Sequence, residues 1–139
     1  MRNTDNPFGR LGITAKLALP YGEALARAKA ALKEEGFGVL TEVDVREILK
    51  DKIDVEFRPY AILGVCNPKL AHQALMVTPA VGLMLPCNVV VEETDGGSVV
   101  SAMDPEAGLA AVGEEGLQPV AKEAKERLSR AIASLKAFA

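Results

Sequence analysis

The pattern of apolar and polar positions predicts five β-strands. In residues 11–19, the side chains of Ile13, Ala15 and Leu17 alternate with less apolar positions, which is typical of a strand with one buried face. Residues 60–65 are apolar on both faces, as expected of a central strand. The predicted strands cover residues 11–19, 38–43, 60–65, 88–93 and 98–103.

Apolar residues spaced three and four apart predict helices between these strands. Proline fits the first turn of a helix, so Pro20, Pro68 and Pro119 mark three helix starts. Asp44 with Glu47 resembles an acidic capping box and indicates a short helix. The predicted helices run from Pro20 to just before Gly36, over residues 45–50, over residues 68–77 and from Pro119 to about Leu135. Residues 78–86 are expected to be irregular and residues 103–118 to be a loop.

The order of elements is therefore β-α-β-(short α)-β-α-β-β-α. One hairpin at Asp95-Gly96-Gly97 and several crossovers favour an α+β, two-layer domain with helices packed on a mixed or antiparallel sheet. We expect residues 1–10 to form a flexible tail and residues 11–139 to form a single domain.

Composition excludes several classes of protein. With 139 residues, 49% apolar and 25% charged, the chain is an ordinary globular one, and its net charge of −3 offers no phosphate-binding track. Two cysteines are too few for a disulfide-built secreted domain. Residues 70–91 contain no Asp, Glu, Lys or Arg, but Pro79, Gly82 and Pro86 argue against a membrane helix. We expect a cytoplasmic protein that binds neither nucleic acid nor membrane.

The distribution of charge is unusual between Pro59 and Val91, where Lys69 is the only charged side chain. A loop with such a sequence would expose apolar side chains, which usually marks an interface or a ligand groove. Burial within the subunit is the alternative. We predict a symmetric homodimer. The predicted interface residues are Val81, Leu83, Met84 and Leu85.

Cys66 and Cys87 are the main candidates for chemistry, and an asparagine follows each of them. They are either inert buried thiols, a redox pair or, with His72, part of a metal site. Asn67 is expected to cap the helix that starts at Pro68, and the amide of Asn88 needs hydrogen-bond partners. The Walker loop, the Rossmann glycine run and the H-E-x-x-H and G-x-S-x-G motifs are absent from the sequence, so we assign no catalytic residue and no metal, and the cofactor stays unknown.

Several short segments of the sequence resemble an uncharacterised family, domain of unknown function 302. They include Phe57-Arg-Pro-Tyr60, Ile62-Leu-Gly-Val-Cys-Asn-Pro68 and Gly82-Leu-Met-Leu-Pro-Cys-Asn-Val-Val-Val91. The resemblance covers about residues 19–135 and implies an α+β fold, a curved sheet and a homodimer, but no known activity. The family pattern falls on Arg58, Tyr60, Cys66, Asn67, Pro68, His72, Pro86, Cys87 and Asn88.

Three hypotheses for function follow. The first is a small homodimer that binds a small ligand. Its binding residues would be Arg58, Tyr60, Cys66, Asn67, His72, Cys87 and Asn88. The second is a thiol-dependent redox or metal-assisted enzyme that uses Cys66, Cys87 and His72. The third is an interaction module without a small ligand.

Overall fold

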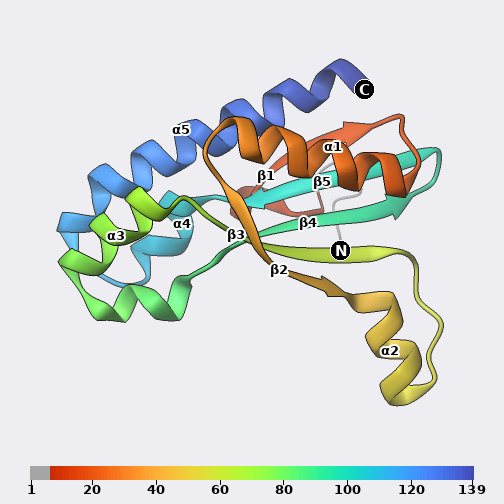
Figure 1. Ribbon diagram of the computed structural model, residues 1–139, viewed down its shortest axis with the longest axis horizontal. Coiled ribbons are helices and arrows are strands. Elements are labelled where there is room, and N and C mark those ends of the chain that lie inside the picture. The colour runs from red at the N-terminus through yellow and green to blue at the C-terminus, as the bar shows by residue number, and fades with distance from the viewer. Residues whose placement is uncertain (1–6) are drawn as a thin grey trace.

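The computed structural model describes residues 7–139 and shows a five-stranded sheet with helices packed on it (Figure 1). The strands lie in the order β1-β5-β4-β3-β2, and the pairings among the described residues are all antiparallel. Their bounds are β1 Gly12–Leu17, β2 Gly38–Asp44, β3 Tyr60–Cys66, β4 Cys87–Thr94 and β5 Gly97–Met103. The predicted α+β class is confirmed, and of the two sheet types left open the antiparallel one is found.

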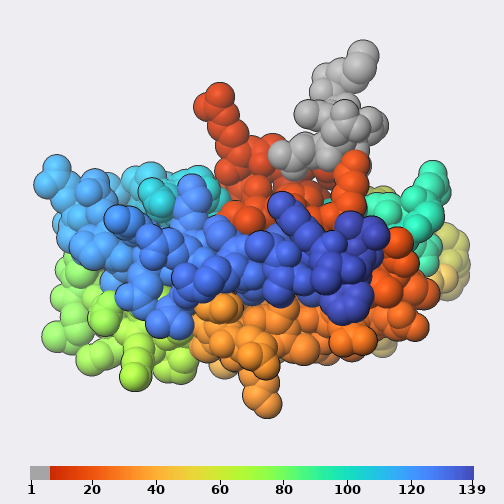
Figure 2. All heavy atoms as spheres, turned by 90° about the horizontal axis from the view of Figure 1, so that it is seen from above, coloured from red at the N-terminus to blue at the C-terminus, as the bar shows by residue number. Residues whose placement is uncertain are grey.

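Two long helices, α1 and α5, lie side by side on the sheet, and α5 runs along the length of the molecule (Figure 2). The α-helices are α1 Tyr21–Glu34, α2 Val45–Ile53, α3 Pro68–Val77, α4 Pro105–Ala110 and α5 Gln118–Leu135. Short 3-10 helices are η1 Gly9–Leu11, η2 Pro79–Met84, η3 Glu115–Leu117 and η4 Lys136–Phe138. The helix predicted over residues 68–77 has the predicted bounds.

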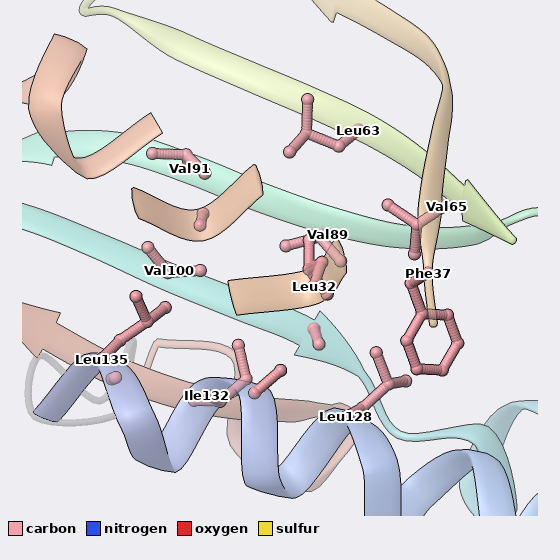
Figure 3. Close-up of a cluster of buried hydrophobic side chains, with 14 of the residues drawn as sticks. Leu32, Phe37, Leu63, Val65, Val89, Val91, Val100, Leu128, Ile132 and Leu135 are labelled. Carbon is pink, nitrogen blue, oxygen red and sulfur yellow. The ribbon is translucent and has the colours of Figure 1, made fainter. Parts of the chain in front are cut away.

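The main hydrophobic core lies between the sheet and these two helices (Figure 3). Its labelled side chains come from α1 (Leu32), the segment after it (Phe37), β3 (Leu63, Val65), β4 (Val89, Val91), β5 (Val100) and α5 (Leu128, Ile132, Leu135). Each of them is at most 2% exposed. Burial of one such side chain stabilises a fold by roughly 1.5–3 kcal/mol, so this layer provides most of the hydrophobic stabilisation.

A second, smaller core joins α3, η2, α4 and the start of α5. It consists of Leu70, Ala74, Val81, Leu109, Leu117, Val120, Ala121 and Ala124. Val81 is fully buried here, and Met84 and Leu85 pack partly against the same cluster. This corrects one interface residue: Val81 points into its own subunit and is not available to a partner. Leu83 is 88% exposed.

The segment predicted as a loop, residues 103–118, contains the helix α4. Asp104 begins it, because its Oδ1 accepts hydrogen bonds from the backbone N–H of Glu106 at 2.9 Å and of Ala107 at 3.4 Å. Gly108, which favoured a loop, is buried in the helix, and a Cβ there would come within 3.0 Å of the Met103 side chain. This glycine therefore permits close packing rather than a turn.

Residues 1–6 of the predicted tail lie outside the described residues. From residue 7 onward the chain enters η1, and the carbonyl of Leu11 accepts a hydrogen bond from the Asp104 N–H at 2.7 Å. In the described part of the chain, no helix combines the length and the apolar character required to cross a bilayer.

Candidate functional site

The seven predicted ligand-binding residues do not form one site. Arg58 and Tyr60 lie at the start of β3, whereas Cys66 and Asn67 lie at its end. Cys87 pairs near that same end, opposite Val65. Six residues along a strand span about 20 Å, so the two groups are too far apart to hold one small ligand.

The first group is organised around a buried carboxylate. The guanidinium Nη2 of Arg58 lies 3.0 Å from Oε2 of Glu92, whose side chain is 4% exposed. Arg58 also stacks over the rings of Phe57 and Tyr60, with centroids 4.5 and 5.9 Å away. Because Glu92 neutralises it, Arg58 is a poor site for an external anion.

Sequence reasoning missed Glu92 and Phe57. The position of Glu92 in a central strand is the feature that could have identified it. Tyr60 and Glu92 are directly opposite each other in β3 and β4, so both side chains lie on the same face of the sheet. A buried carboxylate needs a cationic partner, and Arg58 is two residues from Tyr60.

The second group surrounds the two cysteines, and neither forms a disulfide. Cys66 and Cys87 line one cavity of about 30 Å³ together with Asn67, Leu70 and apolar neighbours. This volume is close to that of one water molecule and is too small for a metabolite. The geometry therefore gives no support to a ligand site at this place.

The environment of Cys87 disfavours its thiolate. Burial raises the pKa of the Cys87 thiol from about 9 to about 11, and the nearby Cys66 adds to the rise. At neutral pH Cys87 is a protonated thiol, so it is not by itself a ready nucleophile.

The remaining predicted residues have separate positions. Asn67 caps α3 as predicted, since its Oδ1 accepts a hydrogen bond from the Leu70 N–H at 3.3 Å. Asn88 is exposed and lies opposite Gly64 in the sheet. His72 is exposed on α3 and does not line the cysteine cavity. Within residues 7–139, no three His, Cys, Asp or Glu side chains come together as a metal site would require.

A wider hollow of about 610 Å³ lies elsewhere, between α4, η3 and the start of α5. Its walls include the apolar side chains of Leu109, Leu117 and Ala121 and the charged side chains of Glu106 and Lys122. Sequence reasoning did not find this hollow, because it depends on the unpredicted helix α4.

The least buried part of the described chain is an arm formed by β2, α2 and the residues up to Glu56. All seven residues of β2 are exposed, and none of the nine residues of α2 is buried. Figure 1 shows α2 standing clear of the other helices. The exposed large apolar side chains of the arm are Val39, Leu40, Val43, Ile48, Ile53 and Val55.

A second exposed apolar surface lies at the corner made by α3 and η2. Its members are Leu75, Met76, Val77 and Leu83, with exposed fractions of 48%, 75%, 39% and 88%. Unlike the arm, both elements are anchored in the subunit, α3 by Leu70 and Ala74 and η2 by Val81.

Comparisons with known proteins agree with this fold and assign no activity. The family described as "Domain of unknown function DUF302" matches residues 13–135. A solved structure described as an uncharacterized conserved protein DUF302 from Bacillus stearothermophilus is 30% identical. The match covers 90% of this chain and 98% of that one, with a TM-score of 0.83. No curated protein matches. With the family match spanning most of its length and a solved relative sharing its fold, this chain belongs to the DUF302 family.

Proposed function

We propose that this chain is an interaction module whose partner is a second copy of itself, and that the arm makes the contact. The observation that carries the proposal is α2, a nine-residue helix with no buried residue. Isolated helices shorter than about 12–15 residues are marginal in water, and most helices gain their stability from packing of an apolar side. Something beyond the subunit is therefore expected to cover α2.

The local polar contacts of α2 in the described chain lie near its ends, and they include an ion pair between Lys50 and Asp54 at 2.6 Å. The Asp44 carboxylate accepts a hydrogen bond from the Glu47 N–H at 3.0 Å, and a cap of this kind contributes about 1 kcal/mol. Asp54 ends the helix in a left-handed conformation, with φ of 52°. These contacts define where the helix begins and ends, but they do not use its apolar side.

That apolar side has the spacing of a packing surface. Val45, Ile48, Leu49 and Ile53 occur at intervals of three, one and four residues and so share one side of the helix. Ile48 and Ile53 are 44% and 62% exposed. Exposed apolar side chains of this kind mark interaction sites.

The charge of the α2 part of the arm favours a second copy over a strongly charged partner. Residues 45–56 contain three basic and four acidic side chains, so this part is close to neutral, whereas Glu42 and Asp44 make β2 acidic. Nearly neutral surfaces do not repel their own copies. A two-fold pair is also the commonest way in which one apolar surface is covered.

Packing of helices is a better contact here than pairing of the β2 edges. The register of β2 shifts between Val39 and Thr41, and Glu42 and Asp44 place two carboxylates on the same edge. A bulge and charged residues are the usual devices that block strand addition at an edge. We therefore assign the contact to the apolar side of α2.

The corner around Leu83 remains the competing interface, in the form predicted from the sequence but without Val81. The cytoplasm is the compartment that the proposal assumes, because the chain has two cysteines and neither forms a disulfide. A metabolite at the cysteines is not part of the proposal, given the small cavity there.

Multi-angle light scattering tests the proposal. We expect a dimer for the wild type at micromolar concentration and a monomer for Ile48→Lys/Ile53→Lys. Leu83→Lys is the control outside the arm, since it adds one lysine at an exposed leucine, and we expect it to remain dimeric. A monomeric wild type would overturn the proposal, and a dimer lost only in Leu83→Lys would overturn the role of the arm.

A further inference from the structure

We propose that Cys66 and Cys87 form a dithiol that a hydroperoxide converts into a disulfide within one chain. Both cysteines belong to the same subunit, so this inference is independent of the proposed dimer. It rests on three features of the structure: the register of β3 and β4, the shared cavity and the helix that begins beside Cys66.

The register brings the two residues within bonding range. Val65 lies directly opposite Cys87, and Cys66 is the next residue along β3. Directly opposed residues of antiparallel strands have Cα atoms about 5 Å apart, and one residue adds about 3.4 Å along the strand. The Cα atoms of Cys66 and Cys87 should therefore be about 6 Å apart, which is within the range of natural disulfides.

Both cysteines also border the same small cavity. Successive residues of a regular strand point to opposite faces, but Cys66 is the last residue of β3, and the chain then turns into α3. Both cysteines line the same cavity of about 30 Å³. The cavity leaves room for the small side-chain movement that bond formation requires.

The two thiols have different surroundings, and this assigns their roles. Cys66 directly precedes Asn67, the cap of the ten-residue helix α3, whereas Cys87 lies at the start of β4. Burial raises the pKa of Cys87 to about 11, which keeps Cys87 protonated. Cys66 is therefore the attacking thiol, and Cys87 is the resolving thiol.

The chemistry proceeds in two balanced steps. The Cys66 thiolate attacks one oxygen of the hydroperoxide, the O–O bond breaks, and the products are Cys66 sulfenic acid and, after protonation, an alcohol or water. The Cys87 thiol then loses its proton to the departing hydroxide as its sulfur attacks the Cys66 sulfur. The S–O bond breaks, the hydroxide leaves with the Cys87 proton as water, and the disulfide forms. Two thiols are oxidised and one peroxide is reduced.

Intact mass after treatment with hydrogen peroxide and alkylation of the remaining thiols tests the inference. For the wild type we expect the loss of two hydrogen atoms, no alkylation, and a peptide map that links residue 66 to residue 87. Cys87→Ser should stop at a sulfenic acid on Cys66 that reacts with dimedone. Cys66→Ser should oxidise at least tenfold more slowly.

Several outcomes would overturn the inference. They are full alkylation of both thiols in the peroxide-treated wild type, a disulfide found only between two chains, or a Cys66→Ser variant that oxidises as fast as the wild type. If a serine variant fails to fold, as shown by circular dichroism, the peptide map of the wild type alone decides whether the bond forms.

Discussion

The guanidinium of Arg58 lies 3.0 Å from the carboxylate of Glu92 and thereby ties the chain before β3 to the middle of the sheet. The Glu92 side chain is 4% exposed and that of Arg58 is 40% exposed. The arginine therefore lets an acidic residue occupy a nearly dry position in β4, and its charge is used within the subunit. This is a structural role for one of the residues first considered for ligand binding.

Removal of Arg58 should destabilise the fold more than an ordinary surface substitution. We expect Arg58→Ala to lower the free energy of unfolding by about 1–2 kcal/mol, because the buried Glu92 loses a charged hydrogen-bond donor. Arg58→Lys should lose less, since it keeps the charge. Urea unfolding measures both. An Arg58→Ala/Glu92→Gln double variant as unstable as the sum of the single variants would show that the pair is not coupled.

Burial predicts very different costs for two leucines. Leu128 of α5 is fully buried in the main core, so Leu128→Ala should cost about 2–5 kcal/mol. Leu83 is 88% exposed. The same substitution there, Leu83→Ala, should therefore cost less than about 0.5 kcal/mol. Thermal unfolding of the two variants checks the contrast. Equal losses would mean that the core assignment or the exposure of Leu83 is incorrect.

The two asparagines that follow the cysteines should also differ. Asn67→Ala removes the cap of α3 and should cost about 1 kcal/mol, whereas Asn67→Asp keeps an acceptor oxygen and should cost little. Asn88→Ala changes an exposed side chain and should be nearly neutral. Chemical denaturation ranks the three variants. A larger loss for Asn88→Ala than for Asn67→Ala would contradict the roles given to them.

Stability should fall at high pH because of Cys87. Its pKa is about 11 in the folded state and about 9 when exposed, so between these values the unfolded chain releases a proton that the folded chain retains. The stability that the protonated Cys87 contributes is fully present below pH 9. As the pH rises to 11, this contribution of up to about 2 kcal/mol is lost. Other groups titrate in the same range, so Cys87→Ala is the reference. Identical pH profiles of the two proteins would refute this environment for Cys87.

Local sequence signals predicted much of the fold. Asn67 and Pro68 predicted the first residue of α3 correctly. The alternation in β1 predicted that Ala15 and Leu17 are buried, and both are 3% exposed. These features depend on neighbours in the sequence. Helix α4 was missed because Gly108 is equally typical of a loop, and only its contact with Met103 explains it.

Features that depend on strand order were not predictable in this way. Val39 and Val43 alternate like a half-buried strand, yet β2 lies at the edge of the sheet and they are exposed. The predicted single ligand site was wrong for a related reason. A family pattern in the sequence does not show how far apart its residues lie, and Arg58 and Cys66 lie at opposite ends of β3. The cysteine pair was identified from the sequence, but its small cavity was not.

Hydrogen exchange at the backbone amides of α2 tests most directly whether a second copy covers the arm. The account predicts that residues 45–53 are protected in a concentrated sample whose mass is that of a dimer, and that protection falls on dilution to the monomer. Rapid, concentration-independent exchange in these residues, with a monomeric mass throughout, would contradict it.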